Sequence, residues 1–254
     1  GNGILRLKPA WVTRDFLPPG KRLGLKEEEY DAGERGFISE RWFASVTNAQ
    51  NRIFVEDEGL SYIDIEEKIH LQDACRAAGD LLMGAEYAAQ HKDLDRLLKI
   101  YDFNCRIFYH LHQQDADAAK IGMNSKEESY HFLDVDTGPH PETFFGVHPY
   151  IVEQNKQYEI FLPYLEEWNG DDRMLQHARA YMNIPGEGFH LPSGILHAPG
   201  TALTLELQES SDIMAVYQAK IGDLQVDKEL LTRQLPEDEV REKGERAALD
   251  IIDW

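Results

Sequence analysis

Short apolar segments separated by turn residues fill most of the chain between residues 103 and 222, and this pattern limits the fold more than any other feature. The segments "TFFGVHPYIV", "TALTLELQ" and "DIMAVYQAKI" have the length and the branched and aromatic content of β-strands. Strand-length segments at such regular spacing predict a β-sandwich or a β-barrel. One stretch of helical character, near residues 153–168, interrupts the series. We therefore expect a mostly β protein with helical additions.

Helical patterns flank this β region on both sides. Residues 67–100 carry Ala and Leu at helical spacing, and residues 223–254 are charged and helical in pattern on either side of Pro236. We expect a single domain over residues 1–222, with a barrel core at about 103–222 and the helical segment inserted before it. Residues 223–254 are expected to form a helical C-terminal tail.

The charge balance excludes several classes of partner. The 254 residues carry a formal net charge of −20, whereas nucleic acids and anionic membrane surfaces attract patches of Lys and Arg. An anionic small substrate stays open, because it requires only a few local cations. No apolar run reaches the roughly 18 residues of a membrane span, and no secretory signal is visible. Two cysteines, Cys75 and Cys105, are too few for a disulfide framework, so we expect a cytoplasmic protein.

Two histidines in "FYHLHQQ" are the first candidates for chemistry. Side chains alternate along a strand, so His110 and His112 share one face and could converge on a single ion. An isolated pair of this kind is more often two surface histidines. The segment "KEESYHFL" adds two carboxylates, Glu127 and Glu128, just before another strand-like run. A carboxylate at the start of a strand is ordinarily a solvated edge residue.

A third histidine follows the turn in "GEGFHLPSGILHAPG". The spacing of Gly186, Pro192, Gly194 and His197 resembles the second motif of the cupin superfamily, and the His-x-His pair followed by a glutamate resembles the first. The resemblance implies a jelly-roll β-barrel in which the residues of both motifs meet.

The resemblance also implies a metal centre in this barrel. A set of three imidazoles and one carboxylate suits a divalent ion, with Zn as the first expectation and Mn, Fe and Ni as alternatives. Its ligands are expected to be His110, His112, Glu128 and His197.

The long insertion between the histidine pair and the glutamate resembles the type I mannose-6-phosphate isomerases. "KEESYHFL" is similar to their Gly-Lys-Thr-Glu-x-Trp-Tyr pattern, and aligning the lysines places Glu128, rather than Glu127, at the ligand position. "SERW", "RLLKIYD" and "FHLPSGILHAPGTALTLELQESSD" resemble further segments of the family. The likeness covers roughly residues 38–212.

The family resemblance implies roles for three more residues. Lys126 is expected to face the sugar or its phosphate, and Glu206 matches an acid near the reacting carbons, which makes it the first candidate for a general base. His190, on the segment that leads into the Pro-Ser-Gly turn, is the second candidate. Other interpretations stay open: Lys126 on a solvated loop, Glu206 facing water from a half-exposed sheet, and His190 as a packed, unreactive side chain.

One position departs from the family pattern. Four residues beyond Asp212, where the family has an arginine, this chain has Val216. An isopropyl group cannot replace a planar guanidinium with five donors. Either another cation takes this role, with Arg106 and Lys220 as candidates, or the substrate and chemistry differ.

Three functions follow as hypotheses. The first is a metal-dependent isomerase that interconverts an aldose and a ketose, free or phosphorylated, through a metal-stabilised enediolate. The second is a carbohydrate-binding protein that has lost catalysis together with the arginine. The third is a metal-dependent oxygenase, which only the ligand set supports. In each case the expected partner is a small molecule, and a homodimer stays open.

Overall fold

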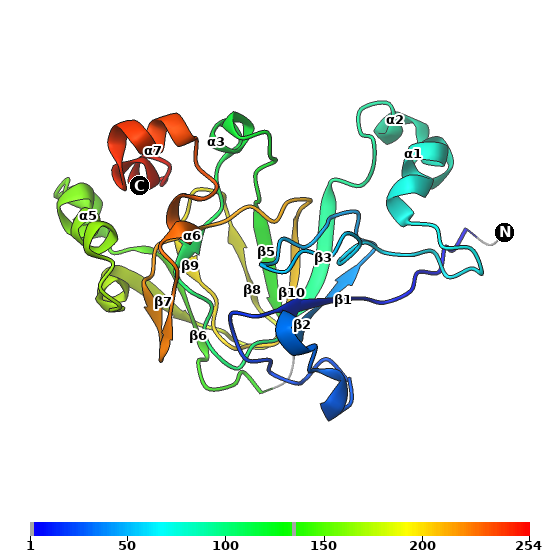
Figure 1. The fold of residues 1–254 in the computed structure, drawn as a ribbon, viewed down its shortest axis with the longest axis horizontal. Coiled ribbons are helices and arrows are strands. Elements are labelled where there is room, and N and C mark those ends of the chain that lie inside the picture. Colours follow the sequence, from blue (N-terminus) through cyan, green and yellow to red (C-terminus); the bar gives the residue numbers. More distant parts are fainter. Residues whose placement is uncertain (1–2, 134–135) are drawn as a thin grey trace.

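The computed structural model describes residues 3–133 and 136–254 and contains two β-sheets that face each other (Figure 1). Every strand pairing in the larger sheet is antiparallel. In order across that sheet, the strands are β1 (Ala10–Arg14), β2 (Phe37–Phe43), β3 (Arg96–Tyr101), β10 (Thr204–Glu209), β5 (Glu128–Phe132) and β8 (Gly188–Leu191). Strands from both ends of the chain therefore combine in one sheet.

The second sheet is also antiparallel. Most of its strands lie, in the sequence, in the segments that connect strands of the first sheet. Its strands, in order, are β11 (Ala215–Val216), β4 (His110–Leu111), β9 (His197–Ala198), β6 (Glu142–Val147) and β7 (Ala178–Met182). A separate hairpin pairs β12 (Lys220–Ile221) with β13 (Leu224–Gln225). The expected mostly β fold with helical additions is confirmed.

The central strand β10 is unusual because its polar side chains face the interior. Thr204, Glu206 and Gln208 are buried, whereas Leu207 is 46% exposed. Alternation along a strand places residues i and i+2 on the same face, so the three polar residues lie together between the sheets. The space between the sheets is therefore lined by polar groups, and a polar pocket can form there.

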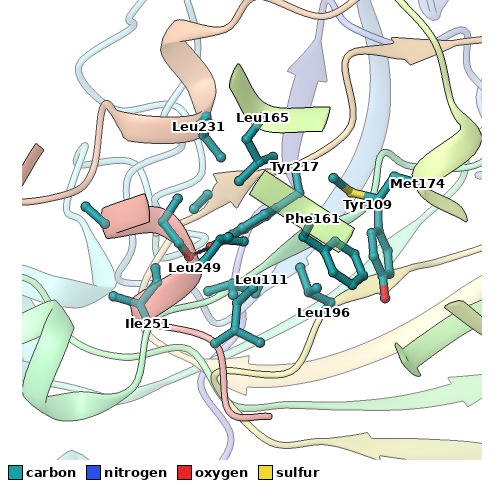
Figure 2. Packing of buried hydrophobic residues seen from close by; sticks show 14 of the residues in the cluster. Tyr109, Leu111, Phe161, Leu165, Met174, Leu196, Tyr217, Leu231, Leu249 and Ile251 are labelled. Atoms are coloured by element: carbon teal, nitrogen blue, oxygen red, sulfur yellow. Dashed lines mark hydrogen bonds between the residues drawn. The ribbon is translucent and has the colours of Figure 1, made fainter. Parts of the chain in front are cut away.

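The outer face of the smaller sheet packs on helices and forms the largest apolar cluster (Figure 2). Tyr109 and Leu111 point to this face, so their neighbours His110 and His112 point to the other. The helices contribute Phe161 and Leu165 from α5 (Gln157–Glu167), Leu231 from α6 (Glu229–Thr232) and Leu249 from α8 (Arg246–Asp250). The C-terminal segment thus packs on its own sheet and holds the histidine-bearing strand from behind.

The remaining helices lie around the sheets. They are α1 (Leu71–Leu82), α2 (Ala85–Ala88), α3 (Asp115–Lys120), α4 (Pro149–Glu153) and α7 (Glu237–Lys243), with short 3-10 helices at Glu27–Glu29, Gly33–Arg35 and Arg173–His177. In the described ranges, no helix has both the length and the apolar character needed to cross a membrane.

The expected helical segment at 67–100 requires one correction. Its first part is helical, but Arg96–Tyr101 forms strand β3 between β2 and β10. Leu97 is fully buried, as is expected for a strand with neighbours on both sides. The segment "RLLKIY" has a short apolar run that periodicity alone cannot assign to helix or strand. The segment becomes a strand because it pairs with β2 and β10.

Candidate metal centre

Three histidines form a buried cluster between the sheets. Nitrogen atoms of His110, His112 and His197 lie within 4.8 Å of one another, and all three residues are at least 96% buried. His110 on β4 pairs directly with His197 on β9, and their ring centroids are 4.2 Å apart. The two segments that carry the family resemblance therefore meet across a pair of adjacent strands.

Each imidazole uses one nitrogen for the backbone. The Nδ1 atom lies 2.7 Å from a carbonyl oxygen in His110, 2.6 Å in His112 and 2.9 Å in His197. The acceptors are the carbonyls of Phe108, Ile213 and Ile195, respectively. An Nδ1–H that donates to a carbonyl fixes the ring orientation and leaves Nε2 as an acceptor for a metal ion.

Glu128 completes the cluster from the opposite sheet. Its Oε1 lies 3.0 Å from Nε2 of His112, and its Oε2 lies 3.5 Å from Nε2 of His197. The Tyr130 hydroxyl donates a hydrogen bond of 2.6 Å to Oε2. Despite this proximity, the Nε2 atoms of His112 and His197 are buried with no hydrogen-bond donor. Buried acceptors that converge without donors are the arrangement that a bound cation satisfies.

The charge states of these residues also suit a cation. Burial, reinforced by the other two histidines, holds the pKa of His110 well below its ordinary value. Burial and the Lys126 ammonium lower the pKa of His112 to about 4. Although burial opposes it, the charge of Lys126 and the neighbouring His112 ring hold the pKa of Glu128 well below its ordinary value. At neutral pH, His110 and His112 are therefore neutral and Glu128 is ionised, which are the metal-binding forms.

The turn before His197 is tied to the histidine strand by its backbone. Gly194 has φ of +85° and its N–H donates to the carbonyl of His112 at 2.7 Å, while its own carbonyl accepts from the N–H of Asp253 at 2.9 Å. Glycine adopts this left-handed conformation without steric cost. The turn thus links the metal cluster to the C-terminal end of the chain.

Lys126 and Glu206 both reach the cluster. Lys126 is 94% buried, with its ammonium 2.9 Å from Glu128 Oε1, and is not on a solvated loop. Glu206 is 98% buried and its Oε1 lies 3.3 Å from the Lys99 ammonium. Burial, together with the charge of Glu128, raises the pKa of Glu206 to about 8. A carboxyl group with this pKa can exchange a proton near neutral pH.

A pocket of about 460 Å³ opens onto these residues and contains an ionic network that the sequence analysis did not find. Arg14 contacts Glu40 at 2.6 Å and Asp212 at 3.3 Å, and the Lys99 ammonium lies 3.6 Å from Glu40. Burial opposes ionisation of Glu40, but Arg14 and Lys99 lower the pKa of its carboxyl to about 2. Lys99, Glu40 and Asp212 lie in segments that already carried the resemblance. The sequence did carry a signal for this network, because Glu40 and Lys99 are charged residues inside otherwise apolar strand-like segments.

Two residues lie away from the cluster. His190 is on β8, but its side chain is 61% exposed and contacts the exposed carboxylate of Glu127 at 2.7 Å. Leu191 on the same strand is buried, so alternation turns His190 outward. The structure therefore does not bring His190, the second candidate for a general base, to the metal centre. It brings Glu128 there and leaves Glu127 outside.

The position of the missing arginine is apolar and closed. Val216 on β11 pairs with His110, is fully buried and packs in an aromatic cluster that includes Phe108. Arg106 forms an ion pair with Glu142 and lies over the Phe144 ring, and neither Arg106 nor Lys220 lines the pocket. The structure therefore does not place either of the two expected substitutes at the metal centre.

Comparisons with known proteins find the same fold in one group of enzymes. No protein-family model and no curated protein matches the chain. Among solved structures, the mannose 6-phosphate isomerase from Bacillus subtilis is 17% identical, with a TM-score of 0.62 over 89% of this chain and 67% of that one. A variant of phosphomannose isomerase from Salmonella typhimurium is 12% identical, with a TM-score of 0.62 over 91% and 74%. A zinc-bound mannose 6-phosphate isomerase is 10% identical, with a TM-score of 0.63 over 91% and 74%.

These matches define the class of structure. The chain has the β-rich fold of mannose 6-phosphate isomerases and spans about two thirds of the Bacillus subtilis enzyme. At identities of 10 to 17%, these structural matches establish the fold alone. In addition, the chain holds a three-histidine cluster that can bind a metal ion.

Proposed function

We propose that the chain is a metal-dependent isomerase that interconverts an aldose and a ketose. One observation carries the proposal: the buried carboxyl group of Glu206 lines the same pocket as His110 and His112 of the histidine cluster. Aldose–ketose interconversion needs a base beside the reacting carbons and a positive charge beside their oxygens. The fold shared with mannose 6-phosphate isomerases supports this reaction class.

His110, His112, His197 and Glu128 would hold the divalent ion, for which zinc is our first candidate. Three imidazole nitrogens and one carboxylate are common zinc ligands, and the unpaired buried Nε2 atoms of His112 and His197 fit a cation. When bound, the ion supplies positive charge that stabilises substrate oxygens as they become negative.

Glu206 would move the proton. In its ionised form, its carboxylate accepts the proton from the carbon next to the carbonyl and then returns it to the former carbonyl carbon. The hydroxyl proton passes between the two substrate oxygens, so the reaction needs no external oxidant or reductant. Lys99, 3.3 Å from Glu206 Oε1, stabilises the ionised carboxylate.

Lys126 would position both the ligand set and the substrate. Its ammonium lies 2.9 Å from Glu128 Oε1, and its side chain lines the pocket. An ammonium has three donors, so Lys126 can bond to Glu128 and also donate to a substrate oxygen. This arrangement holds the carboxylate in its ionised form and orients a hydroxyl near the metal centre.

A carbohydrate-binding protein without catalysis is the second candidate. Its basis is Val216, which is fully buried in the aromatic cluster at the position where the family has an arginine. Zinc-loaded protein incubated with a panel of aldoses, free and phosphorylated, in heavy water separates the two functions. The isomerase forms ketose, and it incorporates deuterium at the carbon beside the carbonyl in each turnover in which the proton on Glu206 exchanges with the solvent before its return. Binding of an aldose with neither product nor exchange contradicts the isomerase and supports the second candidate. Oxygen uptake without ketose would indicate the oxygenase.

A further inference from the structure

The pocket has an aromatic wall that starts and ends at the metal centre. Tyr130, which donates to Glu128, is the first ring, and Phe108, whose ring lies 6.0 Å from that of His110, is the last. Between them, successive ring centroids are 5.2–6.1 Å apart. The rings in order are Tyr130, Tyr101, Phe103, Phe16 and Phe108, and all five line the pocket. Such a wall binds the C–H face of a ligand without selecting for charge.

A second part of the pocket lining is ionic and is called the ionic wall here, but its cations are already paired with carboxylates. The side chains of Arg14, Lys99 and Lys126 are only 6–7% exposed, and each lies within 4.0 Å of a buried carboxylate. Arg14 also donates to the side-chain oxygen of Asn51 at 2.9 Å, so its guanidinium is fully engaged between Glu40, Asn51 and Asp212. A phosphate would have to take these cations from buried carboxylates, which would leave the carboxylates unpaired. Removing one partner from a buried ion pair costs several kcal/mol, roughly 3–5.

The rim of the pocket adds little positive charge. Arg52 is paired with Asp15 at 2.6 Å. Arg233 is exposed and forms no ion pair with any residue in the described ranges, but it shares its segment with the exposed carboxylates Asp227 and Glu229. Over the whole pocket, five basic and seven acidic side chains line the surface. With Glu206 in the ionised form that the reaction requires, a divalent ion would offset the excess of carboxylates and leave no surplus of positive charge for a phosphate dianion.

We infer that the pocket takes an uncharged polyhydroxy substrate, a free aldose, in preference to a sugar phosphate. This inference rests on the proposed function and deepens it. Paired donors and acceptors on the ionic wall, such as Lys99 with Glu206 and Lys126 with Glu128, match hydroxyl groups, each of which both donates and accepts. The aromatic wall covers the apolar face of the sugar. Both walls therefore bind a neutral sugar without breaking an ion pair.

Binding of two alditols tests the inference independently of turnover. A hexitol and its phosphate monoester have no carbonyl group, so calorimetry with the zinc-loaded protein measures binding alone. We expect the hexitol to bind at least about tenfold more tightly than its phosphate. Equal or tighter binding of the phosphate, or no binding of either compound, overturns the inference.

The same pair of ligands separates this inference from the proposed function. If the protein prefers the hexitol but forms no ketose from any aldose, the proposed isomerase activity is refuted and the inferred substrate class is still supported. Ketose formed only from a phosphorylated aldose keeps the isomerase and refutes the substrate class.

Three variants test whether charged residues at the rim of the pocket determine the preference for the uncharged ligand. Glu229→Lys adds a cation there and should strengthen binding of the phosphate by about tenfold, with the hexitol unchanged. Glu127→Lys, the matched control outside the pocket, should change neither affinity. Arg233→Gln should leave hexitol binding unchanged. If the wild type binds the phosphate tightly and Arg233→Gln loses most of that affinity, Arg233 anchors a phosphate and the inference is wrong.

Discussion

His110 and His197 lie directly opposite each other across the antiparallel pair of β4 and β9, with ring centroids 4.2 Å apart. Their neighbours Leu111 and Ala198 pack on the other side of the same sheet, against the C-terminal helices. One short strand pair thus separates an apolar core from a polar centre. The structure fixes the histidines through the packing behind them.

Replacement of His197 by alanine should abolish tight metal binding. The cluster would lose one of three imidazoles, and we expect metal affinity to fall by about 100-fold or more. Elemental analysis and a chelator competition measure this. His190→Ala removes an exposed histidine outside the cluster and serves as the control, and an equal loss of metal in that variant would contradict the assigned centre.

Glu206→Gln should keep the metal and lose turnover. The amide is close in size to the carboxyl but cannot accept the proton, so we expect kcat to fall by about 10²–10⁴. Metal content and kcat on the best aldose of the panel are the measurements. Glu127→Gln changes an exposed carboxylate and should leave kcat unchanged. Full activity in Glu206→Gln would remove this residue from the role of general base.

Gly194→Ala should weaken metal binding although the residue is not a ligand. A Cβ here would lie 3.1 Å from Cβ of Asp253 and 2.6 Å from Nε2 of Gln114, and φ is +85°. Gly186→Ala is a matched control, because its φ is also +85° but no atom lies within 4 Å of its added Cβ. Both variants should lose about 1–2 kcal/mol of unfolding free energy. We expect only Gly194→Ala to lower zinc affinity, by about tenfold, because its N–H bonds to His112.

The free energy of unfolding should decrease at acid pH, because the carboxylate of Glu40 becomes protonated. Its pKa is about 2 in the folded protein against 4.5 as an ordinary value, so its contribution is fully present above about pH 4.5 and is lost as the pH falls towards 2. The contribution is roughly 3 kcal/mol. Glu40→Gln should therefore be less stable than the wild type at pH 7, by a difference that shrinks below about pH 4.5. Urea unfolding from pH 7 to pH 3 measures the difference, and a constant difference would contradict the assignment.

Much of the site could be predicted because its residues obey local rules. Alternation places His110 and His112 on one face, and the Pro-Ser-Gly turn predicts a change of direction before His197. The same rule applied to β8 separates His190 from the buried Leu191 and could have excluded it. The ionic network could not be predicted in this way. Arg14, Glu40 and Lys99 come from three different strands, and each one alone is a typical surface residue.

The sequence by itself determined the strand lengths, their alternation and the types of metal-binding side chain, because these depend on neighbouring residues and on the chemistry of each group. Only the tertiary structure decided which face of β10 is inside, and therefore that Glu206 is buried while Leu207 is exposed. It also decided that Arg96–Tyr101 is a strand and that the buried cations are paired. The physical reason is desolvation: whether a charge is buried, and which opposite charge compensates it, depends on segments distant in sequence.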